Sequence, residues 1–459
     1  MDILNYKNFY LLGIGGIGMS AIASYLKFSG KNVSGYDKTS TSITKKLEQQ
    51  GVYIHYEDDI KMIPKTIAAN KNDSLIIYTP AIPNDSQCMN FFMEKDYSLI
   101  KRAKALAEIT RDKFTIAVGG THGKTTTSAM ICHILKHSGI DCCAFLGGIS
   151  ANYKSNFIPP DHKKTDVFIV EADEYDKSFL ELSPNVLIIT STDADHLDIY
   201  QTHENVIDNY QEFAFRLKKC GTLILREGLT ISAPEYAGKV YYFGFSAQAY
   251  FSARNLKLRK DQFYFDMVSK TEKITDIQLL LPGEHNILNS LAAFAATRLL
   301  LKQVDDFKKA MATFKGVKRR FEYIIKTNKQ IFIDDYAHHP TELTATISTL
   351  RRLYADKKIT AIFQPHLYSR TRDFYKGFAK SLSVLDKVLL LDIYPAREEP
   401  IQGVTSALIL NLLTCPVKIL LTKEELLNII KKEATEVLVT FGAGDIDLLV
   451  DKIENQLTN

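Results

Sequence analysis

The sequence predicts an α/β fold composed of three consecutive α/β domains. Short apolar runs alternate with amphipathic stretches along almost the whole chain, a pattern typical of parallel sheets flanked by helices. Two glycine-rich loops each follow an apolar run and precede a helical stretch, as in nucleotide-binding domains. A chain of 459 residues also exceeds the size of one compact core, so two or three domains are expected.

The first domain, residues 1–109, is predicted to be Rossmann-like. Its strand candidates are the apolar runs at residues 9–12, 32–36 and 75–78. Around residues 105–111 the pattern becomes helical and polar, and a new apolar run then begins. This change places a domain boundary near residue 110.

The second domain, residues 110–316, is predicted to be of the P-loop ATPase type. Its expected strands are residues 114–118, 167–170 and 186–190. Its expected helices are residues 125–136 and 287–301. Alternating polarity over residues 221–282 predicts a β-rich insertion. The third domain, residues 317–459, is again predicted to be Rossmann-like, with buried strands at residues 331–334, 360–363, 388–392, 417–421 and 437–440.

Composition and charge exclude several classes of protein. The 57 Lys and Arg against 53 Asp and Glu leave a net charge of +4 without a long basic run, which argues against a nucleic-acid partner. The six cysteines show no paired metal-ligand spacing and suit a reducing compartment. The N-terminus does not resemble a signal peptide, and the apolar helix at residues 287–301 is too short to span a bilayer. We therefore expect a cytoplasmic protein without a membrane partner.

The first glycine loop reads Leu11-Leu12-Gly13-Ile14-Gly15-Gly16-Ile17-Gly18, directly after a predicted strand. Such glycines permit a tight turn and let the N-terminus of the next helix face a diphosphate. Asp37 ends the following strand and is placed to accept a ribose hydroxyl. NAD, FAD and UDP-sugars all carry a diphosphate, so the loop alone does not select among them, and a plain glycine-rich turn is the competing interpretation.

The second glycine loop reads Gly120-Thr121-His122-Gly123-Lys124-Thr125-Thr126 and follows the strand at residues 114–118. Its backbone N–H groups are expected to surround the phosphates of ATP, with Lys124 at the β- and γ-phosphates and the Thr125 hydroxyl on a metal ion. Val118 stands where the general P-loop has its first glycine, so this loop is a shorter variant. We expect the loop to face solvent.

Acidic clusters follow the next two predicted strands. Glu171 ends the strand at residues 167–170, and Asp193, Asp195 and His196 follow the strand at residues 186–190. We expect these two strands to be neighbours, so that Glu171 and His196 meet at one sheet edge, where they are suited to hold Mg²⁺, with Mn²⁺ also compatible. A solvated acidic loop is the alternative.

Four further side-chain groups are candidates for nucleotide or substrate contacts. Asn286 and Asn289 lie three residues apart on one face of a predicted helix, where they could contact adenine or cap the helix. The guanidinium groups of Arg319 and Arg320 follow a break at Gly316 and suit a phosphate clamp or a surface ion pair. In the third domain, Asp335-Tyr336-Ala337-His338-His339-Pro340 and Gln364-Pro365-His366-Leu367-Tyr368-Ser369-Arg370 each follow a predicted strand.

As an ordered set, these motifs resemble the Mur ligases over essentially the whole chain. The resemblance implies that the chain uses ATP to join L-alanine to the muramate carboxylate of UDP-N-acetylmuramate through an acyl phosphate. It implies a UDP-binding N-terminal domain, a central ATP-binding domain, and a C-terminal domain that closes over ATP and the amino acid. The partners would be these small molecules, and we expect a monomer or weak dimer.

The resemblance also assigns roles to residues. The UDP-substrate would contact the loop and nearby positions Gly15, Gly16, Ile17, Gly18, Asp37, Thr79 and Ala81. ATP would contact Gly120, Thr121, His122, Gly123, Lys124, Thr125, Thr126, Asn286, Asn289, Arg320, Asp335 and Tyr336. Metal ions would be held by Thr125, Glu171 and His196, and the alanine carboxylate by His366 and Arg370. The catalytic residues would be Lys124, Glu171, His196, Arg320 and Asp335.

Three alternative functions remain to be tested. A ligase of the same family that attaches a whole tripeptide to UDP-N-acetylmuramate would share the first two domains' motifs. An NAD-dependent oxidoreductase is suggested by Gly13–Gly18 alone, and a regulatory ATPase would hydrolyse ATP without ligation.

The departures from family relatives are Leu367, where some carry arginine, and Ser191-Thr192-Asp193, where many carry Asn-Ile-Glu. A carbamylated lysine, which sister ligases use for the second metal, has no match here.

Overall fold

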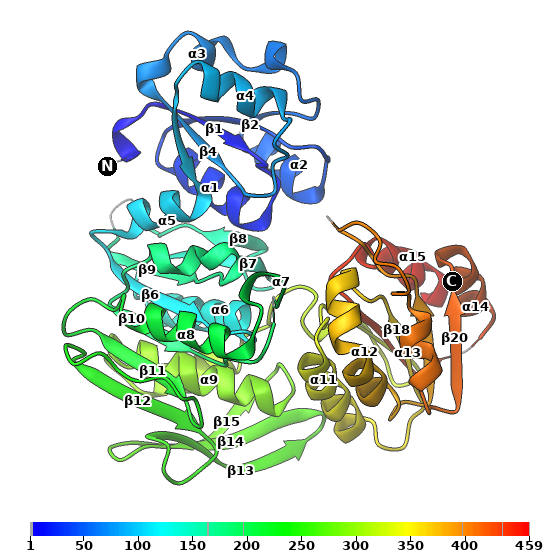
Figure 1. Ribbon diagram of the computed structural model, residues 1–459. Helices are drawn as coiled ribbons and strands as arrows, with labels where there is room; N and C mark the ends of the chain where they lie inside the picture. The colour runs from blue at the N-terminus through cyan, green and yellow to red at the C-terminus, as the bar shows by residue number, and fades with distance from the viewer. Residues whose placement is uncertain (1–2, 163–164, 196, 397, 434, 459) are drawn as a thin grey trace.

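The computed structural model describes residues 3–162, 165–195, 197–396, 398–433 and 435–458. It contains three α/β domains, each built on its own sheet (Figure 1). The N-terminal domain lies at the top of the view, the central domain below it, and the C-terminal domain beside the central one. The predicted fold class is confirmed.

The N-terminal sheet is parallel, with strand order β3-β2-β1-β4-β5. Its strands are β1 (Asn8–Leu12), β2 (Asn32–Tyr36), β3 (Tyr53–His55), β4 (Ser74–Tyr78) and β5 (Ser98–Lys101). Its helices are α1 (Ile17–Phe28), α2 (Ser42–Gln49), α3 (Lys65–Ala68), α4 (Gln87–Glu94) and α5 (Arg102–Thr110). The order reverses between β1 and β4, and the first glycine loop follows β1, so this loop lies at the ligand-binding switch point of the sheet.

The central sheet has ten strands in the order β15-β14-β13-β12-β11-β10-β6-β9-β7-β8. They are β6 (Phe114–Gly119), β7 (Cys143–Ser150), β8 (Ser155–Ile158), β9 (Val167–Glu171), β10 (Val186–Ile189), β11 (Thr222–Arg226), β12 (Lys239–Gly244), β13 (Phe251–Arg259), β14 (Gln262–Val268) and β15 (Lys273–Leu279). The helices are α6 (Lys124–His137), α7 (Leu197–Tyr200), α8 (His203–Ala214), α9 (Glu284–Thr297) and α10 (Asp305–Met311). Helices α6 and α9 cover one face of the sheet, and α8 covers the other. Ile116 belongs to the same core as α6 and α9, whereas its neighbour Ala117 belongs to the core that contains α8.

One expectation for this domain is confirmed and one is wrong. The β-rich segment at residues 221–282 is confirmed as β structure, and it continues the central sheet as β11 to β15. The expectation that Glu171 and His196 follow neighbouring strands is wrong, because β6 lies between β9 and β10. The ATP loop after β6 is therefore flanked by the segments that follow both strands.

The C-terminal sheet has the order β16-β17-β21-β18-β19-β20 and is parallel except for β16. Its strands are β16 (Glu322–Lys326), β17 (Ile331–Asp335), β18 (Ile359–Phe363), β19 (Lys387–Leu391), β20 (Val417–Leu421) and β21 (Val437–Phe441). Its helices are α11 (Pro340–Leu353), α12 (Tyr368–Leu382), α13 (Ala407–Leu412), α14 (Lys423–Lys432) and α15 (Asp447–Thr458).

The predicted strands are confirmed, while β3, β5, β7, β8 and β16 were not predicted. Most of these strands are short or pair at a sheet edge, so their apolar patterns are weak. The helix predicted at residues 287–301 begins three residues earlier and ends at Thr297. The first sheet lies before residue 110, the second between residues 110 and 317, and the third after residue 317. The exact domain boundaries stay predictions. Within the described chain, no helix combines the length and apolar character needed to cross a membrane.

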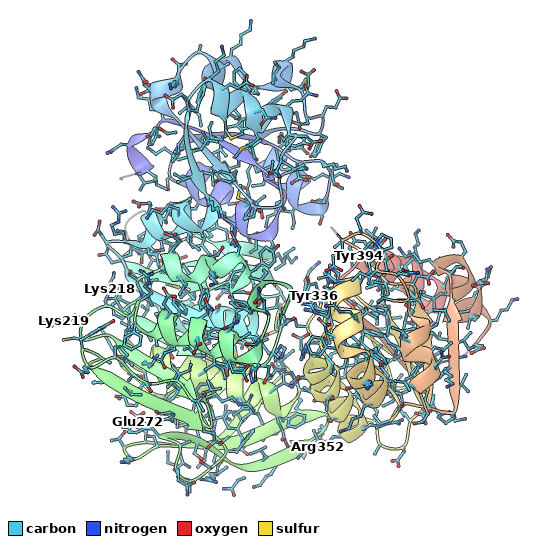
Figure 2. The ribbon with its side chains drawn as sticks, viewed as in Figure 1. Lys218, Lys219, Glu272, Tyr336, Arg352 and Tyr394 are labelled. Carbon is cyan, nitrogen blue, oxygen red and sulfur yellow. The ribbon has the colours of Figure 1, made fainter. Side chains whose placement is uncertain are left out.

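The two junctions of the central domain are built differently. Helix α1 of the N-terminal domain packs on β7, β8 and β9, where the Tyr25 ring lies 5.5, 6.0 and 6.2 Å from the rings of Phe145, Phe157 and Phe168. The C-terminal domain contacts the central domain through charged pairs, such as Arg352 Nη1 with Glu284 Oε1 at 2.7 Å, and one apolar cluster also continues from the central domain into it. Figure 2 shows Arg352 at that contact and Tyr336 on the side of the C-terminal domain that faces the central one.

Candidate active site

A cavity of about 980 Å³ is lined by all three domains. Its walls include parts of both glycine loops, the segment after β9 and the polar tips of the C-terminal sheet. The sequence-predicted residues among its lining are Gly16, Ile17, Gly18, Thr79, Ala81, Thr121, His122, Gly123, Lys124, Thr125, Glu171, Arg320, Tyr336, His366 and Arg370. Motifs more than 200 residues apart in the sequence are thus brought to one space.

The ATP loop connects the end of β6 to the first residue of α6. Gly123 has φ +82°, and a Cβ atom there would lie 2.5 Å from Asn289 Oδ1. Asn289 therefore packs directly against the loop backbone, and its Nδ2 donates to Asn286 Oδ1 at 3.2 Å. Asn286 Nδ2 in turn donates to the Pro282 carbonyl at 2.7 Å. The two amides share one helix face as expected, and here they support the phosphate loop and the start of α9.

Lys124 is buried within the site rather than solvent-facing. Its side chain is 13% exposed, and its ammonium group lies 2.8 Å from the Glu174 carboxylate. It also donates to the Gly120 carbonyl at 2.7 Å. Burial lowers the pKa of Lys124, but the negative charges of Glu174 and Glu171 outweigh burial and raise it. The expectation of a solvent-facing loop is wrong at this side chain, because the segment after β9 folds over it.

Thr125 and Glu171 form an oxygen-rich pair beside the loop. The Thr125 hydroxyl donates to Glu171 Oε1 at 3.0 Å, and the Gly147 N–H donates to Glu171 Oε2 at 2.7 Å. Arg320 Nη2 lies 3.3 Å from the same hydroxyl and reaches it from across the domain junction. A hydroxyl beside a carboxylate is a donor set that Mg²⁺ accepts. In the described part of the chain no three His, Cys, Asp or Glu side chains are grouped to hold a metal, and the predicted ligand His196 lies outside those residues.

His122 connects the ATP loop to the C-terminal domain. Its Nδ1 lies 3.2 Å from Glu342 Oε1 on α11, and its Nε2 lies 3.3 Å from Asp193 Oδ2. Burial lowers the pKa of His122, but hydrogen bonds and charges from Asp193 and Glu342 outweigh burial and raise it to about 9. A pKa of about 9 favours the protonated imidazole at neutral pH, and the ring lies between two carboxylates from different domains.

Asp335 and Tyr336 have separate environments although they are adjacent. The Asp335 carboxylate is buried in its own domain, where it accepts bonds from the Ala337 N–H at 2.9 Å and the Thr346 hydroxyl at 2.9 Å. Burial raises the pKa of Asp335 to about 6. Tyr336 lines the cavity, with the guanidinium carbon of Arg320 5.7 Å from its ring centre. Of the two, Tyr336 is the one positioned to meet a ligand.

Arg319 fixes the bend at which the chain enters the C-terminal domain. It has φ +60°, an uncommon value for a residue with a side chain. Its Nε donates to Asp334 Oδ2 at 3.0 Å and its Nη2 to the Gly442 carbonyl at 2.8 Å. Arg319 therefore anchors the junction, while its neighbour Arg320 points to the ATP loop.

The predicted amino-acid residues meet on the C-terminal side of the cavity. Arg370 Nη1 lies 3.3 Å from His366 Nδ1. The other edge of the guanidinium donates from Nε and Nη2 to Asp195 Oδ1, at 3.2 and 2.8 Å. The ring of His366 stacks on that of Tyr394, with centres 5.7 Å apart.

On the opposite side of the cavity, the first glycine loop is held by charged residues. The Gly15 N–H donates to Asp37 Oδ2 at 2.8 Å, so this carboxylate supports the loop itself. Arg102, the first residue of α5, packs against Gly18. A Cβ atom added to Gly18 would lie only 2.7 Å from Arg102 Nη1. Its Nη2 donates to Asp173 Oδ2 at 2.8 Å. This arginine spans the diphosphate loop and the acidic segment beside the ATP loop.

Arg102, Glu174 and Glu342 are site residues to which sequence reasoning gave no role. Glu174 lies three residues after Glu171 in the acidic segment that follows β9, and this position after a strand was the available signal. Arg102 and Glu342 carry no local signal, because their contacts depend on how separate domains dock.

The fold and the cavity define a class of protein: an enzyme in which a phosphate-binding loop and a diphosphate-type loop face each other across a cleft closed by a third domain. Three family models match in chain order: the Mur ligase family catalytic domain at residues 8–114, the Mur ligase middle domain at 118–297, and the glutamate ligase domain at 319–444. The chain belongs to the Mur ligase family.

Similar proteins cover the whole chain. A UDP-N-acetylmuramate–L-alanine ligase from Christiangramia forsetii is 46% identical over 99% of this chain and 99% of its own length. The enzyme of the same name from Porphyromonas gingivalis is 46% identical over 98% of this chain and 99% of its own length. The UDP-N-acetylmuramate–alanine ligase structure from Thermotoga maritima aligns with a TM-score of 0.79 and 26% identity over 98% of both chains. A murein peptide ligase from Psychrobacter arcticus has the same fold, with a TM-score of 0.71 and 22% identity over 99% of both chains.

Proposed function

We propose that this chain joins L-alanine to the muramate carboxylate of UDP-N-acetylmuramate, with ATP converted to ADP and phosphate. The observation that carries the proposal is the single cavity on which the diphosphate loop, the ATP loop and the His366–Arg370 pair converge. The relatives that match over their full lengths bear the name of this activity. We place the reaction in the cytoplasm, where ATP and UDP-linked substrates are available, and expect a monomer or weak dimer.

In the proposed reaction, an oxygen of the muramate carboxylate attacks the γ-phosphorus of ATP and the bond to ADP breaks. The amine of alanine then attacks the acyl carbon, phosphate leaves, and the amine loses a proton as the amide forms. Lys124 and Arg320 are positioned to neutralise the charge that spreads over the transferring phosphoryl group. The Thr125 hydroxyl and Glu171 carboxylate would hold Mg²⁺, which supplies further charge neutralisation at the phosphates when bound.

The docked C-terminal domain brings these groups together at one cavity and limits the access of water to it. An acyl phosphate hydrolyses if water reaches it, so the buried contacts of Arg370 and Glu342 with the central domain serve the second step as well as the first. The C-terminal domain supplies Tyr336, His366 and Arg370, so amide formation requires this domain to be docked.

A phosphate-release assay with UDP-N-acetylmuramate, ATP and a panel of acceptors tests the proposal. We expect release that depends on both the UDP-substrate and L-alanine. Faster turnover with a tripeptide acceptor would instead assign the chain to tripeptide attachment, and release that does not depend on any acceptor would indicate an ATPase without ligation. The family assignment and the ATP site decide against an NAD-dependent oxidoreductase.

A further inference from the structure

We infer that Asp195 is a positioning residue for the amino-acid site: it orients Arg370 from across the domain junction. This inference rests on the proposed function, since it concerns how the acceptor amino acid is held. Asp195 follows β10 in the central domain, and Arg370 lies in the first turn of α12 in the C-terminal domain. The pair is 175 residues apart in the chain and forms only when the two domains dock.

The geometry of the pair fixes the guanidinium group. Asp195 Oδ1 accepts from both Nε and Nη2 of Arg370, which removes free rotation about the end of the side chain. The side chains are 8% and 5% exposed, so the contact is shielded from solvent and salt. The remaining Nη1 edge is directed to His366, and all three residues line the cavity. A carboxylate ligand would therefore meet an arginine whose orientation is already set.

The chemistry favours orientation over a second possibility. Asp195 could instead occupy the place of the substrate carboxylate and be displaced when alanine binds. However, a guanidinium has five N–H donors, and Asp195 engages one edge of the group while the other edge faces His366. A carboxylate can thus bind Arg370 while Asp195 stays in contact with it. The two possibilities predict opposite changes in the affinity for alanine.

Docking of the C-terminal domain and formation of the alanine pocket are consequently one event. Asp195 lies on the loop that also carries Asp193, the partner of the ATP-loop residue His122. The pair Asp195–Arg370 thereby links the amino-acid pocket to the phosphate loop through one short segment of the central domain.

The test is the variant Asp195→Asn, which keeps the shape of the side chain and removes its charge. With phosphate release as the readout, we expect the KM for L-alanine to rise by about 10- to 100-fold, because small displacements of a substrate-orienting group have effects of this order. The KM values for ATP and for UDP-N-acetylmuramate should stay within about twofold of the wild type, as expected for surviving contacts elsewhere in the cavity. A general loss of structure would raise all three.

A matched control is Asp373→Asn, on the same helix as Arg370. Asp373 pairs with the exposed Arg372, and its loss should leave all three KM values unchanged. The variant Arg370→Lys keeps the positive charge but loses the two-donor edge, so it should raise the alanine KM in the same direction. Because both changes remove one interaction, the double variant should be no worse than Arg370→Lys alone.

An unchanged alanine KM in Asp195→Asn would overturn the inference, and a lowered KM would show that Asp195 competes with the substrate carboxylate. If Asp195→Asn does not fold, Asp195→Glu takes its place, with a smaller rise in the same KM expected. Failure of the proposed function is a separate outcome: the wild-type enzyme would then show no phosphate release that depends on L-alanine.

Discussion

The two junctions of the central domain differ in what holds them together. The junction with the N-terminal domain has an aromatic core from α1, β7, β8 and β9, with ion pairs such as Arg102–Asp173 at its edge. At the junction with the C-terminal domain, the cavity is crossed by polar contacts: His122 with Glu342, Asp195 with Arg370, and Thr125 with Arg320. Both junctions border the same cavity, but they respond to different changes.

This difference indicates which part of the enzyme moves. Buried apolar contacts are non-directional and gain nothing from a ligand's charge, so the N-terminal junction is expected to stay closed throughout the reaction. Buried ions need partners, and a bound nucleotide or metal changes which partners are available. The C-terminal junction is therefore the one expected to open and close with substrates, by rigid movement of its domain.

The largest effect should come from the charge at the centre of the cavity. Lys124→Ala removes the ammonium group that would neutralise the transferring phosphoryl group, and we expect ligation to fall by about 1000-fold or more. Phosphate release with saturating substrates measures it. Lys136→Ala is the matched control: Lys136 is a buried, ion-paired lysine on the same helix, and it lies away from the cavity. Activity in Lys124→Ala within tenfold of the wild type would remove the phosphate-binding role of the loop.

Truncation at the apolar junction should affect stability rather than chemistry. Tyr25→Ala leaves a cavity among Phe145, Phe157 and Phe168, at a cost of about 3 kcal/mol. Thermal unfolding should shift to lower temperature, while the KM for L-alanine in the folded enzyme stays near the wild-type value. A change confined to the alanine KM would show that this junction also responds to the acceptor, contrary to the contrast between the two junctions.

At the polar junction, Glu342→Gln should have an intermediate effect. The variant keeps the shape of the side chain but removes the charge that faces His122, and we expect kcat/KM for ATP to fall by about tenfold. Comparing Tyr25→Ala with Glu342→Gln tests the contrast between the two junctions. Tyr25→Ala should lower the unfolding temperature more, and Glu342→Gln should lower kcat/KM for ATP more.

The same ion pair predicts a pH dependence. The pKa of His122 is raised from 6.5 to about 9, so the stabilisation from its charge is complete below about pH 6.5 and is lost as the pH rises through about 9. The facing groups are Asp193, Glu342 and the ring of His339. Small-angle scattering between pH 7 and pH 10, in the window set by this raised value, should show the C-terminal domain separating as the pH rises. In Glu342→Gln the transition should move to lower pH, and identical curves would contradict the assignment of His122 to the junction.

The sequence predicted the parts of the site that lie within one strand, loop and helix. Both glycine loops, Lys124 and Thr125 have local spacing that determines their place, and each loop follows its strand in the structure. The order of strands in a sheet is not the order in the chain, which is why β6 separates β9 from β10 against expectation. Contacts such as His122–Glu342 and Asp195–Arg370 depend on domain docking, so no local pattern predicts them. Asp335 shows the same limit, since its neighbour Tyr336 faces the cavity and it does not.

The smallest effects should separate two adjacent residues at the start of α5. Lys101 pairs with Asp176 at 3.2 Å, with the two side chains 53% and 40% exposed, whereas Arg102 is 19% exposed and lies against Gly18. An exposed ion pair contributes about 0.5 kcal/mol or less, so Lys101→Ala should leave the unfolding temperature and all KM values nearly unchanged. Arg102→Ala removes a cation from the N-terminus of α1, where the diphosphate of the UDP-substrate is proposed to bind. We expect the KM for the UDP-substrate to rise about fivefold, because about 1 kcal/mol of charge-assisted hydrogen bonding is lost. The KM for L-alanine should not change. Equal effects of the two variants would mean that both arise from the ion pairs with Asp176 and Asp173 at the edge of the N-terminal junction, and Arg102 would then have no role in holding the substrate.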